Sequence, residues 1–199
     1  KLVEKQLESI KNQVLSPDYV IIRDDGSTDG TVQFVRDYIK HHNLVGWTIT
    51  QNEKNLGWRL NFRQLLIDSQ NTDADVIFLS DQDDIWVDTK IEVLVGCIGN
   101  YLMVYADSVS FFDKIPSYVA ARKEEFVLTG LRFISLQYGV LGHDCLMRKE
   151  LIQITPKEVR EKFVYDFALA LVARSKRSLL HKVENLTYFR RHPHASSNL

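Results

Sequence analysis

Short apolar, β-branched runs alternate with helical segments through the first half of this chain. Residues 19–22, 47–50, 75–79 and 101–106 are such runs, and they predict strands. Apolar residues at helical spacing predict helices before, between and after them. Strands that alternate with helices favour a mainly parallel sheet covered on both faces, so the expected fold class is α/β, an αβα sandwich. The expected helices are 1–13, 32–39, 60–69, 86–98 and 166–174.

Composition excludes several classes of protein. The chain has 199 residues and a net charge of −1, which suits one globular domain and gives no bulk field that would recruit nucleic acid. Its two cysteines, Cys97 and Cys145, form no disulfide or metal-binding pattern, which favours a reducing, cytoplasmic compartment. No apolar run approaches the ~20 residues that cross a bilayer, and no signal-peptide pattern occurs.

Two of the predicted strands end in acidic clusters, Asp24–Ser27 (DDGS) and Ser80–Asp84 (SDQDD). Ligands of parallel sheets bind beyond the carboxyl ends of the strands, where both clusters would lie. Crowded carboxylates repel one another unless a cation or hydrogen-bond donors compensate, and Mg²⁺ and Mn²⁺ prefer oxygen ligands. The second cluster therefore predicts a site for a divalent cation.

Each acidic residue also has a simpler structural interpretation. Asp24–Ser27 is compatible with a plain turn followed by a helix cap, because Asp and Ser bond readily to nearby backbone amides. Asp84 is equally compatible with the N-cap of a helix that begins near Trp86, and Asp166 with the N-cap of a later helix. The residues alone leave these alternatives open.

Several short motifs occur in an order that matches a known family. Ile21–Thr31 (IIRDDGSTDGT), Asn52–Phe62 (NEKNLGWRLNF) and Phe78–Trp86 (FLSDQDDIW) resemble the successive motifs of family-2 glycosyltransferases. The likeness is strongest to the bacterial branch of rhamnosyltransferase-like enzymes of surface polysaccharide synthesis. Tyr165–Leu171 and Phe189–His192 resemble two later signatures of the same family. The likeness covers most of the chain and is weak in its middle.

The resemblance implies a glycosyltransferase-A fold, Rossmann-like, that transfers a sugar with inversion at the anomeric carbon. It implies a UDP- or dTDP-sugar donor, Mn²⁺ or Mg²⁺, and a glycan or lipid-linked acceptor. That acceptor would place the enzyme in the cytoplasm, in peripheral association with the inner face of the membrane. One domain, 1–199, is expected, with a nucleotide-sugar-binding half at 1–107 and an acceptor-side half at 108–199. The first strand of the family pattern is not found before Lys1.

Roles for single residues follow from the same resemblance. Asp81 and Asp83 match the Asp-x-Asp pair that meets ribose, metal and diphosphate, and His192 matches a late metal ligand. Asp166 matches the general base on the acceptor hydroxyl, with Asp144 as second choice. The residues assigned to the nucleotide sugar are Asp24, Asp25, Ser27, Asn55, Gly57, Asn61, Asp81, Gln82 and Arg190.

Other polar residues and other functions are compatible with parts of the sequence. His143 and Cys145 are expected to be packing or surface residues, since no further ligands complete a zinc set. The pair Arg190-Arg191 either faces a diphosphate or is merely solvated. A sugar-nucleotide pyrophosphorylase shares a similar nucleotide-binding sheet, but the Gly-rich loop of that class does not occur here. A non-catalytic domain that binds nucleotide sugars or glycans is the third hypothesis.

Overall fold

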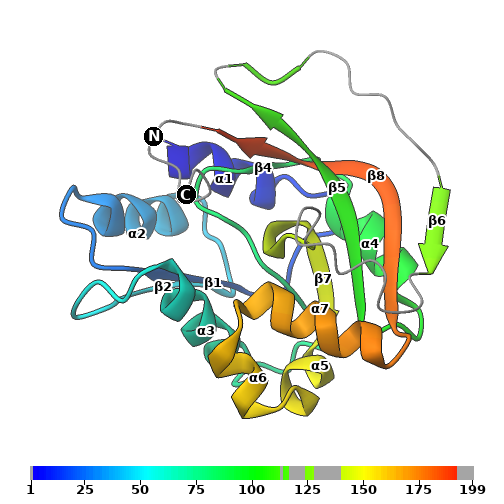
Figure 1. The fold of residues 1–199 in the computed structure, drawn as a ribbon. Helices are drawn as coiled ribbons and strands as arrows, with labels where there is room; N and C mark the ends of the chain where they lie inside the picture. The colour runs from blue at the N-terminus through cyan, green and yellow to red at the C-terminus, as the bar shows by residue number, and fades with distance from the viewer. Residues whose placement is uncertain (1, 113, 117–123, 128–139, 192–199) are drawn as a thin grey trace.

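The first two strands form a small parallel sheet of their own (Figure 1). The structure is a computed structural model, and it describes residues 2–112, 114–116, 124–127 and 140–191. Strand β1 (Val20–Asp24) pairs in parallel with β2 (Trp47–Gln51), so that Asp24 lies opposite Gln51. Helix α1 (Leu2–Lys11) precedes this sheet, α2 (Thr31–His41) connects its strands, and α3 (Trp58–Ser69) follows it.

A larger sheet of six strands contains the rest of the strands, in the order β3-β7-β5-β8-β4, with β6 also paired to β8. Its strands are β3 (Val76–Phe78), β4 (Ile85–Trp86), β5 (Met103–Phe111), β6 (Glu124–Val127), β7 (Cys145–Arg148) and β8 (Leu179–Arg190). The accompanying helices are α4 (Lys90–Ile98), the short 3-10 turn η2 (Gly142–Asp144), α5 (Lys149–Ile154), α6 (Lys157–Lys162) and α7 (Tyr165–Ser175).

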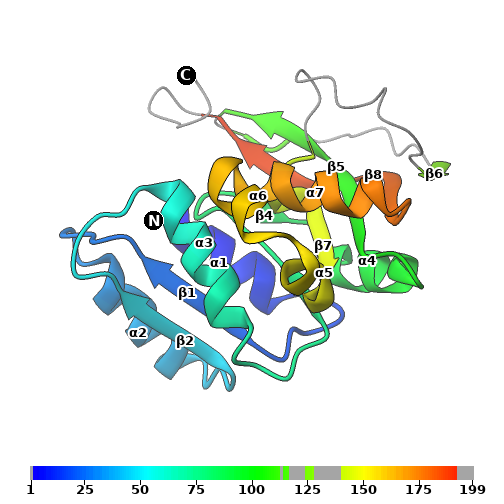
Figure 2. The same cartoon turned by 60° about the horizontal axis from the view of Figure 1, so that its bottom comes forward.

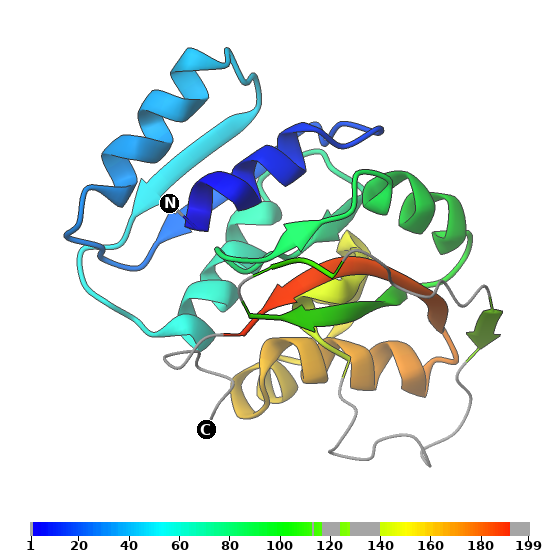
Figure 3. The same ribbon diagram turned by 90° about the horizontal axis from the view of Figure 1, so that it is seen from above.

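Helices cover both faces of the larger sheet, which confirms the αβα class. Neighbouring residues of a strand point to opposite faces, and Met103 and Val104 of β5 accordingly join different apolar clusters. Met103 packs with residues of α5 and α7, whereas Val104 packs with Leu94 and Ile98 of α4. Figure 2 shows α3 between the β1–β2 pair and the group α5–α7, and Figure 3 shows α4 and α7 on opposite sides of the sheet.

The strand directions differ from the expected mainly parallel sheet. Only β1–β2 and β5–β8 pair in parallel among the described strands, while β3–β7, β4–β8, β5–β7 and β6–β8 are antiparallel. The helical alternation that predicted parallel strands holds only up to residue 78. Beyond it, β4 follows β3 with no helix between them, and β7 returns antiparallel against β3 and β5.

The predicted start of one helix is wrong. The helix expected to begin at Trp86 begins at Lys90, because Ile85 and Trp86 pair with β8 as strand β4. Asp84 is therefore not an N-cap, and Thr89 holds that position. Near the end of the described chain, β8 continues as far as Arg190, with Asn185 paired to Asp107 of β5.

A cavity of about 480 Å³ separates the two sheets. It is lined by β1 on one side and β3 on the other, with Leu7 and Ile10 of α1 and Phe62 and Leu65 of α3 above and below. Among the described residues β1 pairs only with β2 and β3 only with β7, so an edge of each strand faces this space. The cavity is therefore lined as a space would be that could hold one more strand, with a strand on either side and a helix on either face.

Candidate active site

The first acidic cluster forms a tight turn at the end of β1. The Oδ1 atom of Asp24 accepts hydrogen bonds from the amides of Gly26 at 3.0 Å and Ser27 at 2.7 Å. Aspartate side chains commonly close such turns by bonding to nearby backbone amides, so the turn itself requires no ligand. Asp24 is buried, whereas the Ser27 side chain is exposed beside it.

Asp25 holds the loop between β2 and α3. Its Oδ1 atom accepts hydrogen bonds from Asn52 Nδ2 and the Leu56 amide, and its Oδ2 atom accepts one from the Gly57 amide, all at 2.8 Å. The side chain of Asn55 returns a bond to the Asp25 carbonyl at 3.0 Å. Three residues of the second family motif are therefore held by the carboxylate of Asp25 in the first motif, and a fourth, Asn55, is held by its carbonyl.

A polar ladder continues from this loop beneath β1. Asn61 accepts a hydrogen bond from Asn52 at 2.9 Å and donates one to the Arg23 carbonyl at 3.0 Å. The guanidinium of Arg23 bonds Asn52 and pairs with Asp68, the latter at 2.6 Å. These contacts fix α3 against β1. Arg23 and Asn61 also line the cavity between the sheets, as does Gln82 from the loop after β3.

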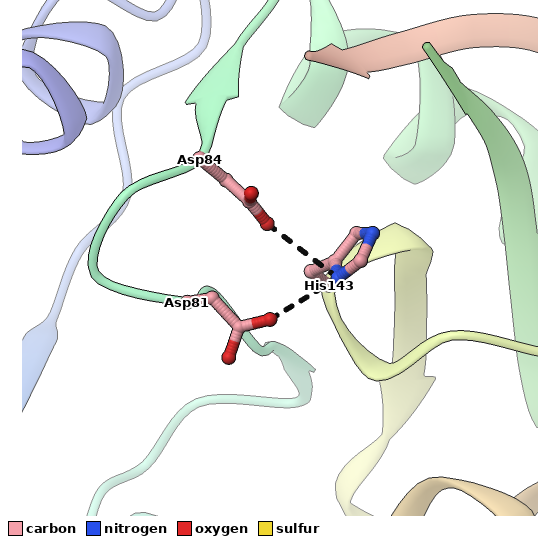
Figure 4. Close-up of side chains that lie close together, drawn as sticks. All are labelled: Asp81, Asp84 and His143. Carbon is pink, nitrogen blue, oxygen red and sulfur yellow. Dashed lines mark hydrogen bonds and ion pairs between the residues drawn. The ribbon is translucent and has the colours of Figure 1, made fainter. Parts of the chain in front are cut away.

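The second acidic cluster meets a histidine from a distant part of the chain (Figure 4). His143 Nδ1 lies 3.2 Å from Asp81 Oδ2 and 3.5 Å from Asp84 Oδ2. These three side chains offer ligand atoms that lie within 4.8 Å of one another. Asp84 is fully buried, and its Oδ2 atom accepts no hydrogen bond within the described part of the chain. An unsatisfied buried carboxylate oxygen beside an imidazole suits a divalent cation.

Neighbours hold the imidazole of His143 in its orientation. The other ring nitrogen, Nε2, lies 3.4 Å from Asp144 Oδ2, and the ring stacks on Phe189 with centroids 4.8 Å apart. A histidine that faces a carboxylate on one side and a prospective metal on the other is a common arrangement in metal proteins. Asp144 is itself buried, and it lies beside the ring nitrogen of His143 that is not the one next to Asp81 and Asp84.

Burial and mutual charge shift the pKa values of this cluster. Removal from water raises the pKa of Asp84 to about 7, and the carboxylates of Asp81 and Asp83 add to that rise, while His143 opposes it. Burial alone would lower the pKa of His143. Its hydrogen bond with Asp81 and the charges of Asp144 and Asp84 outweigh burial, so that its pKa is raised. The cluster therefore strongly favours the binding of a positive charge, either a proton or a cation.

Asp166 is joined to the same turn from the other side. Its Oδ2 atom accepts a hydrogen bond from the Gly142 amide at 3.2 Å, and its Oδ1 atom accepts one from the Phe167 amide at 2.7 Å. Burial raises the pKa of Asp166, these two amides oppose the rise, and the charge of Asp81 adds to it. The turn η2 thus connects Asp166, through Gly142, with Asp81 and Asp84, through His143.

The remaining assigned residues lie in different surroundings. Asp83 is buried, but it is outside the group formed by Asp81, Asp84 and His143. Arg190 is also buried: its amide donates to Asp84 Oδ1 and its Nε to the Asp83 carbonyl, both at 3.3 Å, so it supports the acidic loop from behind. His192, assigned as a metal ligand, lies outside the described residues.

Sequence reasoning missed His143, which was expected to be a packing or surface residue. Its neighbour Asp144 and the buried strand that follows were visible, but nothing in the local pattern places residue 143 beside residues 81 and 84. Only the antiparallel pairing of β7 with β3, which sets Leu146 opposite Phe78, brings the two loops together.

The family of the chain follows from comparison with known proteins. The family described as Glycosyl transferase family 2 matches residues 1–160, more than half of the sequence. The chain belongs to this family. A curated relative, dTDP-rhamnosyl transferase RfbG from Shigella flexneri, is 32% identical over 125 residues. That match covers 63% of this chain and 42% of RfbG, so this chain corresponds to less than half of the relative's length.

Solved structures share the fold at low identity. TarS of S. aureus in complex with UDP-GlcNAc has a TM-score of 0.73 at 17% identity, covering 98% of this chain and 56% of TarS 1-349. The mannosyltransferase PcManGT from Pyrobaculum calidifontis in complex with GDP-Man and Mn2+ has a TM-score of 0.63 at 16% identity, covering 92% of this chain and 51% of PcManGT. Both support the glycosyltransferase-A architecture. Within the described residues, every helix is too short or too polar to cross a membrane.

Proposed function

We propose that this chain is the catalytic part of an inverting, metal-dependent glycosyltransferase. It would move a sugar from a nucleotide-diphosphate donor to a hydroxyl group of a cell-surface glycan or lipid-linked acceptor. The observation that carries the proposal is the turn η2, which sets His143 against Asp81 and Asp84 and sets Gly142 against Asp166. One turn would thereby join a site for a cation and a partly buried base, the two groups that such a transfer needs.

The donor would bind along the ends of β1 and β3. Asp24, Asp25 and Ser27 would meet the base and ribose, because the carboxyl ends of strands in such sheets face the ligand. Asn55, Gly57 and Asn61 would shape the adjoining wall, since Asp25 and Asn52 hold their loop in place. Asp81 and Gln82 would follow at the ribose and diphosphate, with Arg190 supporting their loop from behind.

The described residues fit a divalent cation. Asp81, Asp84 and His143 are the group that would hold it, and the unsatisfied Oδ2 atom of Asp84 supports this choice. Asp83 and His192 remain proposed ligands from the family resemblance. A bound Mn²⁺ or Mg²⁺ supplies positive charge for the diphosphate that leaves. The protein's own contribution is to hold the carboxylates close together, with Asp84 fully buried, so that they favour a bound cation.

Asp166 would accept the proton of the attacking hydroxyl. Its raised pKa makes it a better proton acceptor than an exposed aspartate, while the Gly142 and Phe167 amides hold the carboxylate in one orientation. Asp144 suits this role less well, because it is buried behind His143. A hydroxyl acceptor carried by a lipid would place the reaction at the inner face of the membrane.

Binding and turnover together test this function. Mn²⁺ and a panel of UDP- and dTDP-sugars are titrated into the protein by calorimetry, and release of the nucleoside diphosphate is followed. Metal-dependent donor binding with slow hydrolysis or transfer is expected from the wild type, and Asp84→Asn should weaken Mn²⁺ binding more than Asp83→Asn. Pyrophosphate-dependent cleavage of the donor would indicate a pyrophosphorylase instead, and tight binding without turnover a non-catalytic domain.

A further inference from the structure

A lysine side chain is sealed inside the protein next to the acidic cluster. Lys90, the first residue of α4, has no exposed surface. Its ammonium donates hydrogen bonds to the His143 carbonyl at 2.5 Å and to Thr187 Oγ1 at 2.7 Å, and it lies 4.2 Å from the centre of the Trp86 ring. A buried lysine without an opposite charge is strongly disfavoured, so its surroundings must compensate it.

The acidic cluster is what compensates this charge. Burial lowers the pKa of Lys90 to about 8, and the carboxylates of Asp144, Asp84 and Asp81 oppose that fall. An apolar side chain at this position would avoid the cost of burial altogether. The presence of a charge here therefore calls for a role beyond packing.

The two hydrogen bonds of Lys90 connect three segments that are far apart in the sequence. The side chain starts from α4 and bonds both Thr187, in the last third of β8, and a carbonyl of the turn η2. That carbonyl belongs to His143, whose ring faces Asp81 and Asp84. The preceding residue of the same turn, Gly142, donates its amide to Asp166.

We propose that Lys90 is a positioning residue, whose ammonium fixes the turn η2 so that His143 meets Asp81 and Asp84 while Gly142 meets Asp166. It touches neither donor nor acceptor in this scheme and acts through the turn. The effect of Lys90 on metal binding rests on the proposed function, whereas its hold on the turn η2 does not. The experiment below separates the two.

A simple counter-charge would behave differently from a positioning residue. If Lys90 only balanced the carboxylates, its removal would leave them with more net negative charge, and Mn²⁺ would bind more tightly. If Lys90 positions the turn, its removal frees His143 and weakens Mn²⁺ binding. The direction of the change in Mn²⁺ affinity therefore distinguishes the two roles.

The full chain is compared with Lys90→Met by amide hydrogen exchange without metal and by Mn²⁺ titration followed by electron paramagnetic resonance. Loss of two charge-assisted hydrogen bonds should speed exchange at residues 141–146 about tenfold. Mn²⁺ affinity should fall by about fivefold or more as an imidazole ligand loses its place. Lys157→Met, which changes an exposed lysine on α6, is the matched control and should alter neither measurement.

The exchange measurement tests the positioning role of Lys90, and the Mn²⁺ titration tests both this role and the metal site. Unchanged exchange at residues 141–146 in Lys90→Met would overturn the positioning role, and so would tighter Mn²⁺ binding. If the wild type binds no Mn²⁺, the metal part of the proposed function fails, and the exchange result still decides what Lys90 does to the turn. Should Lys90→Met not fold, Thr187→Val removes one partner and keeps the ammonium. It should speed exchange at the same residues to a smaller extent, and normal protection there would contradict the proposal.

Discussion

Asp166 combines a partly buried carboxylate with the proposed task of accepting a proton, and this combination would set the pH dependence of the reaction. A base must be deprotonated to work, and burial raises the pKa of Asp166. Transfer should therefore fall as the pH drops through that raised pKa, beginning at a higher pH than for an exposed aspartate. A pH profile of kcat/KM tests this. Asp166→Asn should lose ~10²–10⁴-fold in kcat and keep donor binding. Full activity in that variant would shift the base role to Asp144.

Gly142 leaves no room for a side chain beside the base. A Cβ atom there would approach the buried ring of Tyr165 to 2.9 Å, and Tyr165 is stacked on Phe62 and cannot retreat freely. Gly142→Ala should therefore cost about 1–3 kcal/mol in the free energy of unfolding, and it should also lower kcat by displacing the Gly142 amide from Asp166. Urea unfolding and steady-state kinetics measure both effects.

Gly96, in the last turn of α4, provides the matched control for this substitution. A Cβ atom at Gly96 meets nothing within 4 Å. Gly96→Ala should raise the free energy of unfolding by about 0.5–1 kcal/mol through helix propensity and leave kcat unchanged. Equal effects of the two alanines would show that the crowding at Gly142 has no consequence.

At the scale of elements, one carboxylate determines the start of α3. Asp25 accepts three hydrogen bonds from residues 52–57, and Gly57 enters the helix with φ of 79°, a conformation that such contacts must maintain. Asp25→Ala should destabilise the protein by about 1–3 kcal/mol and weaken binding of UDP or dTDP, because the loop loses its anchor.

A second aspartate of the same motif serves as the comparison for Asp25. Asp29 is exposed and bonds to Thr31. Asp29→Ala should change the free energy of unfolding by less than about 1 kcal/mol. Calorimetric titration with UDP and urea unfolding distinguish the two variants, and an Asp29→Ala effect as large as that of Asp25→Ala would contradict the anchoring role.

For the whole molecule, the division into two sheets predicts unequal local stability. The small sheet of β1 and β2 has a cavity on one side, whereas β5 and β8 lie in the middle of six strands and are covered on both faces. Amide hydrogens of β1 and β2 should exchange at least about tenfold faster than those of β5 at Met103 to Ala106. Equal protection of both sheets would mean that the cavity does not weaken the small one.

The sequence predicted the first half of the fold better than the second for a physical reason. Up to residue 78 strands and helices alternate, and the period of the apolar residues shows both kinds of element. After that point, β4 has only two residues and half of the residues of β8 are polar. Their composition therefore does not identify them as strands, and only their pairing with other strands does. The alternation of strands and helices predicted parallel strands, and this prediction fails for β7, which pairs antiparallel with β3 and β5.

Residue types and their local spacing determined by themselves that this chain forms an α/β domain of its family, with acidic turns at the ends of two strands and an aspartate opening a late helix. Tertiary structure alone decided which side chains meet. His143 joins Asp81 and Asp84, and Lys90 reaches the same turn, because antiparallel strands place residues about 60 positions apart side by side. Local sequence patterns reflect what stabilises a single helix or strand, whereas a site made from four segments depends on how those elements pack together.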